Sequence, residues 1–343
     1  YMAIADALLK LGTVFLLLEL PGDKIVVYGK LLLIVASITT ATYMFICFRK
    51  YAECRFRNIR WDPILAKEIM GFTSWTLLGQ LTTVARGAAI TILLNQYFTP
   101  VVIAARAIAL NVAGQANMLA LQFNTSLYPP IIKAYAANQK NEMYSLINNG
   151  CKATFFLMWI LALPLLLELE RILTLWLKEP PAYAVEFARL TLVEALILAV
   201  SLPLATAARA PGKMAAYETI LGSLQMSILL VAWLFLRSGY GPQSVFYVAI
   251  AVNLIMFAVR LKIVSYLIGL PVFNYLKQAL LPVLSVVVVS FDAARPLSLV
   301  FPDTFWYLPV SLAGILAICS ISMNFLGLTP SMRGKLKAAI IKK

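Results

Sequence analysis

The chain has 343 residues, of which 62% are hydrophobic and 13% are charged, and its mean hydropathy is +0.85. Soluble domains are about half apolar and about a quarter charged, so this composition excludes an ordinary soluble domain and indicates a polytopic membrane protein. The formal net charge is +14, but in a membrane protein the placement of charge matters more than its sum, and we expect no nucleic-acid partner.

Two residue types limit the chemistry that the chain can perform. Histidine is absent, so no imidazole is available to bind a metal or to carry a proton near neutral pH. The cysteines have neither a CxxC motif nor a zinc-like spacing, and none lies in a loop that we place outside the cell. They are Cys47, Cys54, Cys151 and Cys319. We therefore expect no metal, no cofactor and no disulfide framework.

Apolar stretches recur along the chain and predict an all-α membrane bundle of about ten transmembrane helices. Each stretch, at ~1.5 Å per residue, is long enough to cross ~30 Å of hydrocarbon. A spanning segment must satisfy its own backbone hydrogen bonds, and the alternating segments of a β-barrel are not seen. The predicted spans are 2–20, 25–48, 68–94, 100–127, 150–169, 182–204, 214–236, 244–267, 272–292 and 305–326.

The start of the chain does not resemble a signal peptide. The first residue is Tyr1 rather than methionine, and an apolar stretch follows directly, without a charged region or a cleavage site. We therefore expect that the chain lacks the N-terminal part of a longer protein.

The cations alternate between successive loops, which predicts the orientation of the bundle. One alternate set of loops, together with the neighbouring span ends, holds nineteen of the 29 Lys and Arg residues, and the other set holds five. The positive-inside rule places the richer set, and both ends of the chain, in the cytoplasm. The longest basic loop, FRKYAECRFRNIRWDP at 48–63, is expected to anchor the topology beside anionic lipid.

Five cations remain inside the predicted spans: Lys10, Lys30, Arg86, Arg106 and Arg189. Lys30 lies close enough to a span end to reach the interface. Lys10 has Asp6 four residues before it, and Arg189 has Glu186 three residues before it, so we expect two local ion pairs.

Arg86, in TTVARGAAI, and Arg106, in IAARAIAL, lie at similar depth in the predicted outer half of the bilayer. A charge inside a span costs at least ~2.5–3.5 kcal/mol, so such residues usually face a polar interior or a cavity. Extension of the side chain to the outer interface is the alternative, and it applies more readily to Arg106 than to the deeper Arg86.

Amide and hydroxyl groups accompany these arginines. On a helical wheel Arg106, Asn117 and Asn124 share one face of the fourth span, and Asn111, Gln115 and Gln122 share another. Hydrogen bonds between helices, at ~0.6 kcal/mol each, would explain a few such groups but not so many. We therefore predict a water-filled lumen with a substrate site at Gln80, Arg86, Arg106, Asn111, Gln115 and Asn117.

Glu194 is the clear mid-span acid of this region. It either binds a proton or cation that drives transport or pairs with Arg86 or Arg106 across the bundle, and pairing is slightly favoured. Two planar guanidinium groups with few acids nearby suit an anionic ligand such as a phosphate or diphosphate.

Residues 71–136, which begin GFTSWTLLGQLTTVARGAAI and end PPIIKAYA, resemble the signature helix pair of bacterial polysaccharide repeat-unit (O-antigen) flippases. These proteins belong to the multidrug/oligosaccharidyl-lipid/polysaccharide transporter superfamily. The segments at 175–192 and 207–213 match the same pattern. The resemblance implies the last two helices of an N-terminal lobe with a basic cytoplasmic loop at 1–66, a six-helix C-terminal lobe at 67–268, and two additional helices with a basic tail at 269–343.

The resemblance implies a flippase of the bacterial inner membrane that translocates undecaprenyl-diphosphate-linked oligosaccharide for surface polysaccharide or lipopolysaccharide synthesis. It implies alternating access of a central cationic cavity, with the lipid-linked oligosaccharide, membrane lipids, a polysaccharide polymerase and glycosyltransferases as partners. Such a transporter is needed because a charged diphosphate headgroup cannot cross hydrocarbon unassisted. The polar residues that usually follow the arginine of the third span are here Gly87 and Ala88, which departs from the family pattern.

Three other functions stay open. A cation-coupled multidrug antiporter of the same superfamily would centre on carboxylates, of which Glu194 is the clear example in mid-span. A membrane enzyme would need acidic or histidine catalytic groups at a membrane face and a sizeable soluble loop, and neither is visible. A scaffold without transport activity is the third alternative if most of one lobe is missing.

Overall fold

The computed structural model describes residues 2–51, 62–300, 307–328 and 333. All regular structure in these ranges is helical, which confirms the all-α prediction. In the same ranges nine helices are long and apolar enough to cross a membrane, so the chain is a multi-pass membrane protein. Cys54, the centre of the basic loop and most of the basic tail lie outside the described residues.

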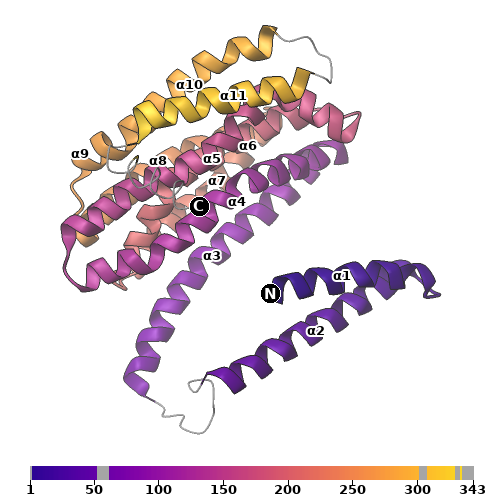
Figure 1. Cartoon of the computed structure of the whole chain (residues 1–343), viewed down its shortest axis with the longest axis horizontal. Helices are drawn as coiled ribbons and strands as arrows, with labels where there is room; N and C mark the ends of the chain where they lie inside the picture. Colours follow the sequence, from indigo (N-terminus) through magenta and orange to yellow (C-terminus); the bar gives the residue numbers. More distant parts are fainter. Residues whose placement is uncertain (1, 52–61, 301–306, 329–332, 334–343) are drawn as a thin grey trace. The chain divides into compact units, whose positions relative to one another are not determined.

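The helices follow the predicted order along the chain (Figure 1). They are α1 (Met2–Glu19), α2 (Lys24–Lys50), α3 (Pro63–Tyr97), α4 (Pro100–Ala136), α5 (Lys140–Leu177), α6 (Ala184–Ala208), α7 (Ala215–Arg237), α8 (Ser244–Ile268), α9 (Val272–Tyr275), α10 (Leu281–Val300) and α11 (Leu308–Ser322). Two π-helical segments, η3 (Leu276–Leu280) and η5 (Met323–Gly327), precede α10 and follow α11.

The chain divides into two compact units, Tyr1–Lys67 and Glu68–Lys343. In the first, α1 and α2 pack as a hairpin (Figure 1). The carboxylate of Asp6 lies 2.7 Å from the Lys10 ammonium, which confirms the predicted pair, and it accepts a hydrogen bond from Thr39 of α2 at 3.4 Å. α1 has 18 residues, of which three are charged, and it is not among the nine candidate spans.

In the second unit α4, α5 and α6 pack against one another, α6 also packs against α8, and α8 packs against α7. Small side chains on α4 permit close approach, because a row of buried alanines faces its neighbours. That row contains Ala105, Ala109, Ala113, Ala116 and Ala120. The α10–α11 hairpin lies along α5 (Figure 1). The proposed boundary between a lobe at 67–268 and two added helices at 269–343 stays a prediction.

Several helices are longer than the spans predicted from hydropathy. α4 continues through Pro129 and Pro130 to Ala136, and α5 begins at Lys140 rather than at residue 150. Hydropathy marks only the part of a helix inside hydrocarbon, and internal prolines are tolerated where neighbouring groups satisfy the freed carbonyls. α5 also has a kink at Glu168, four residues after Pro164.

Lys152, which lies just inside the predicted span that begins at residue 150, lies within α5 with 2% of its surface exposed. One detail of the charge analysis is wrong. The pair of Glu186 and Arg189 does not form among the described residues. Glu186 instead accepts a hydrogen bond from Gln243 at 3.2 Å, and Arg189 donates one to the Leu166 carbonyl at 3.3 Å. Each of the two residues therefore bonds to a distant part of the chain instead of to the other.

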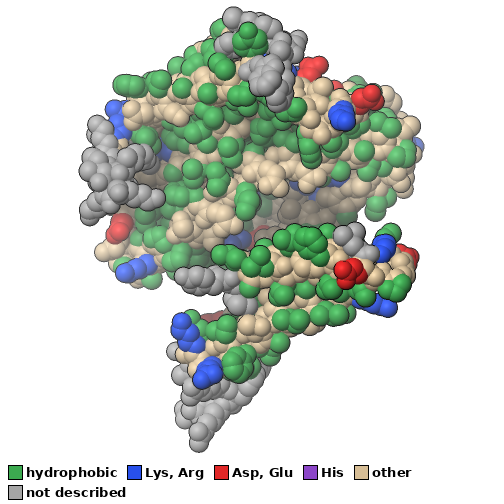
Figure 2. Space-filling view, turned by 45° about the vertical axis from the view of Figure 1, so that its right-hand side comes forward, with side chains coloured by type: hydrophobic (Ala, Val, Ile, Leu, Met, Phe, Trp, Pro, Cys, Tyr) green, Lys and Arg blue, Asp and Glu red, His purple; other side chains and the backbone are tan. Residues whose placement is uncertain are grey.

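The surface has the composition of a lipid-facing protein. Hydrophobic side chains cover much of the visible face, and acidic and basic side chains are few (Figure 2). Large apolar side chains such as Leu230, Tyr266 and Val288 are more than half exposed, which suits contact with hydrocarbon rather than with water.

Candidate functional site

Arg86 of α3 forms an ion pair with Glu194 of α6. Its Nη1 donates to Glu194 Oε1 at 3.0 Å, and the two side chains are 16% and 13% exposed. Asn253 of α8 donates from Nδ2 to the same carboxylate oxygen, also at 3.0 Å. Three helices therefore meet at one carboxylate, and the pairing favoured by the sequence is confirmed for Arg86.

Arg106 of α4 reaches α3 rather than the outer interface. The side chain is 8% exposed, and its guanidinium donates to the Thr91 hydroxyl and, at 3.2 Å, to the carbonyl oxygen of Gly87. The alternative in which Arg106 extends toward the outer interface is therefore wrong. Arg106 fastens α4 to α3 next to Arg86.

The three charged groups form one electrostatic cluster with an excess of positive charge. Arg106 interacts repulsively with Arg86 and attractively with Glu194, but only Arg86 forms an ion pair with that carboxylate. Two buried polar atoms of this cluster have no hydrogen-bond partner, Arg86 Nε and Asn253 Oδ1, and Asn117 Oδ1, eleven residues along α4 from Arg106, also has none. An unsatisfied buried group costs about 1–3 kcal/mol, so a ligand or water that satisfied them would gain binding energy.

The structure divides the predicted site residues into two groups. Arg86, Arg106 and Asn117 point into the bundle, whereas Gln80, Asn111 and Gln115 are exposed on the second unit. The Asn111 amide donates to the carbonyl of Ala107 on its own helix at 3.0 Å. The face of α4 that carries Asn111 and Gln115 is more exposed than the face that carries Arg106 and Asn117. That these residues form one substrate site stays a prediction.

Residues 76–234 match the family model described as MatE. The match covers less than half of the chain, and residues 76–234 alone are called the MatE domain. This domain begins inside α3, ends inside α7, and includes Arg86, Arg106 and Glu194. No curated protein and no solved structure matches the chain. MatE proteins are transporters rather than enzymes, so the match supports membrane transport within the predicted superfamily.

A second polar cluster lies at the other end of the MatE domain, where α6 ends and α7 begins. Glu218 packs on Gly79 of α3, whose Cβ, if present, would lie 1.9 Å from Glu218 Oε2. Arg209 and Arg260 act electrostatically on Glu218, and each has a buried Nε without a partner. Sequence reasoning missed this cluster, because the positive-inside rule already accounted for Arg209 and Arg260 as cations of the cytoplasmic side.

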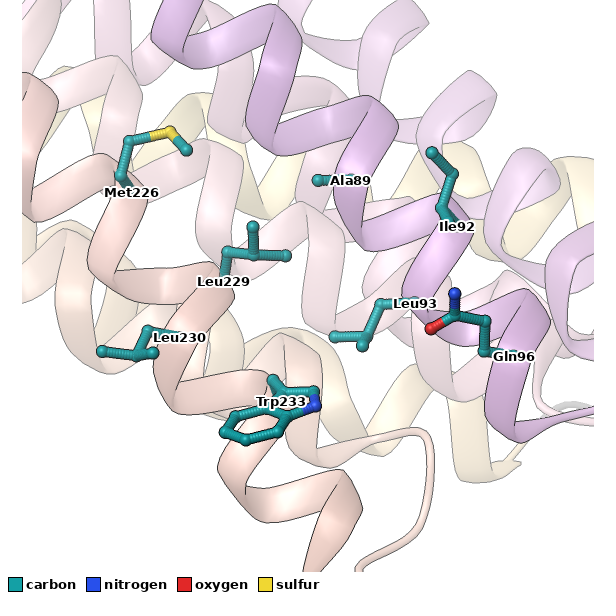
Figure 3. Close-up of a pocket in the computed structure, with 8 residues that line it drawn as sticks. All are labelled: Ala89, Ile92, Leu93, Gln96, Met226, Leu229, Leu230 and Trp233. Carbon is teal, nitrogen blue, oxygen red and sulfur yellow. The ribbon is translucent and has the colours of Figure 1, made fainter.

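An apolar groove separates α3 from α7 in the MatE domain (Figure 3). Its volume is about 400 Å³, and its lining includes Leu93, Leu229 and Leu230, with Gln96 and Trp233 as the polar-tipped side chains. The ion pair of Arg86 does not line it. The groove suits a hydrocarbon chain rather than a charged headgroup.

The described residues contain no group of three His, Cys, Asp or Glu side chains that could hold a metal ion. Cys47, Cys151 and Cys319 are free thiols. The groups described at the site are guanidinium, carboxylate and amide groups, which can bind an ionic or polar ligand.

Proposed function

We propose that this protein is a flippase that moves undecaprenyl-diphosphate-linked oligosaccharide from the cytoplasmic to the periplasmic leaflet of the bacterial inner membrane. The observation that carries the proposal is the charge of the buried cluster, in which Arg86 is paired with Glu194 whereas Arg106 donates to the uncharged Thr91 hydroxyl and Gly87 carbonyl. A site with an uncompensated positive charge favours an anionic ligand over a cation.

The ion pair supplies a route for binding the diphosphate. A phosphate oxygen can replace Glu194 on Arg86 while the guanidinium stays paired, so the large cost of an unpaired buried charge is avoided. Asn253 keeps its hydrogen bond to the released carboxylate. Arg106, one helix away, then lies beside the same anion. In the proposed first step the phosphate therefore replaces Glu194 as the partner of Arg86, rather than binding to an unpaired guanidinium.

The other predicted residues fit the remaining parts of such a substrate. Gln80, Asn111 and Gln115 are exposed on α3 and α4, and amides donate and accept hydrogen bonds as sugar hydroxyls require. The polyprenyl tail remains in lipid or in an apolar groove. Glycosyltransferases would supply this substrate, and a polysaccharide polymerase would consume the product.

The test is flipping of a fluorescent polyprenyl-diphosphate oligosaccharide in proteoliposomes, measured by bleaching with a reductant that does not cross the membrane. Arg86→Gln and Arg106→Gln should each slow flipping about tenfold or more, because each removes a charged hydrogen bond. Lys262→Gln, at an exposed lysine of α8, is the matched control. Wild-type rates in both arginine variants, with normal insertion, would refute the proposal.

The alternative is a cation-coupled multidrug antiporter. The observation that favours it is the partly buried Glu194 carboxylate, which already accepts two hydrogen bonds from other helices and could exchange Arg86 for a proton or sodium ion. The antiporter predicts dye efflux driven by an ion gradient and abolished by Glu194→Gln. The flippase predicts no such efflux, and sugar-lipid movement that depends on Arg86.

A further inference from the structure

Lys152 is a buried cation that the proposed transport site does not use. Its side chain lies inside α5 with 2% of the residue exposed. In the described part of the chain it makes neither an ion pair nor a hydrogen bond. Its Nζ is not among the fully enclosed atoms, and lysine is almost never this deeply buried without a partner, so an anion that reaches it from outside the protein is the natural counter-charge.

The contacts of its helical neighbours show what Lys152 faces. One turn before it, Asn148 donates from Nδ2 to Gln278 of η3 at 3.0 Å. One turn after it, the ring of Phe156 lies 2.4 Å from the position of a Cβ on Gly327 of η5. Residues four apart share a helix face, so Lys152 faces the junction between η3 and η5. Such π-helical turns are frequent at functional sites.

A second buried polar group lies at this junction. Asn148 is 6% exposed, and its Oδ1 has no hydrogen-bond partner. The amide and the ammonium are on one face of α5, a turn apart, so together they offer donors to an anion and an acceptor to the ammonium. Neither group belongs to the cluster of Arg86, Arg106 and Glu194.

We infer that Lys152 and Asn148 hold a phosphate-bearing anion where α5 meets η3 and η5. A phosphate group satisfies the ammonium with strong charge-assisted hydrogen bonds. The predicted membrane span begins at residue 150, on the predicted cytoplasmic side, so Lys152 lies near the depth of lipid phosphates. An anionic phospholipid and free phosphate share this chemistry. Because η3 and η5 lie outside the MatE match, the bound phosphate would fasten the C-terminal hairpin to the MatE domain.

The experiment measures lipid binding to the purified full chain. Phosphatidylglycerol or phosphatidylcholine is titrated into the detergent-solubilised protein, and bound lipid is counted by native mass spectrometry. Lys152→Met should weaken phosphatidylglycerol binding about tenfold or more, and Lys152→Arg should keep it. Lys262→Met, at an exposed lysine, is the matched control and should bind like wild type.

Inorganic phosphate in a parallel titration separates the two sources. Displacement of phosphatidylglycerol by millimolar phosphate would identify free phosphate as an occupant, and displacement only by anionic lipid would identify the headgroup. If Lys152→Met does not fold, Asn148→Ala provides the second variant, with several-fold weaker binding expected. Unchanged phosphatidylglycerol affinity in the folded variants would overturn the inference.

Discussion

Removal of the Glu194 charge should destabilise the bundle more than removal of the Arg86 charge. In Glu194→Gln, Arg86 and Arg106 remain close together without an acid between them. Breaking a buried pair by removing one partner costs about 3–5 kcal/mol. Because these side chains keep 13% and 16% exposure, we expect a value near the lower end, about 3 kcal/mol.

In Arg86→Gln the remaining charge of Glu194 is better compensated than the arginine charges are in Glu194→Gln. Glu194 keeps the hydrogen bond from Asn253 at 3.0 Å and the attraction of Arg106, so the expected cost is about 1–2 kcal/mol. The double variant Arg86→Gln/Glu194→Gln has lost both charges of the ion pair, so neither is left without its partner. A coupling free energy of about 2 kcal/mol should therefore make the double variant more stable than Glu194→Gln.

The assay is unfolding of the purified protein in detergent, followed by circular dichroism for the wild type, both single variants and the double variant. A double-mutant cycle then gives the coupling free energy directly. Additive losses, or a Glu194→Gln variant as stable as wild type, would refute the argument that the guanidinium groups depend on this carboxylate.

Two further predictions follow from packing. Gly327→Ala places a Cβ 2.4 Å from the ring of Phe156, so the melting temperature should fall by an amount that corresponds to about 1–3 kcal/mol; an unchanged melting temperature would mean that η5 does not pack closely on α5. The thiols of Cys151 and Cys319 are buried, whereas Cys47 is partly exposed, so a membrane-permeant maleimide should label Cys47 first. Equal labelling rates for Cys47, Cys151 and Cys319 in the folded protein would contradict this burial pattern.

The sequence alone determined the class of the protein and the depth of its charges. A spanning segment makes its backbone hydrogen bonds within itself, so apolar length was enough to predict the helices from α2 to α11. The i to i+4 spacing of Asp6 and Lys10 was enough to predict their ion pair. The two faces of α4 could also be read from the helical period.

Tertiary structure alone decided which groups meet. Arg86 and Glu194 are 108 residues apart, and no local rule states which neighbour a helix face will contact. The same limit explains the error. Glu186 and Arg189 found partners on other parts of the chain, Glu186 at Gln243 and Arg189 at the Leu166 carbonyl. Hydropathy gives depth in the membrane, but contact depends on how the helices pack around one another.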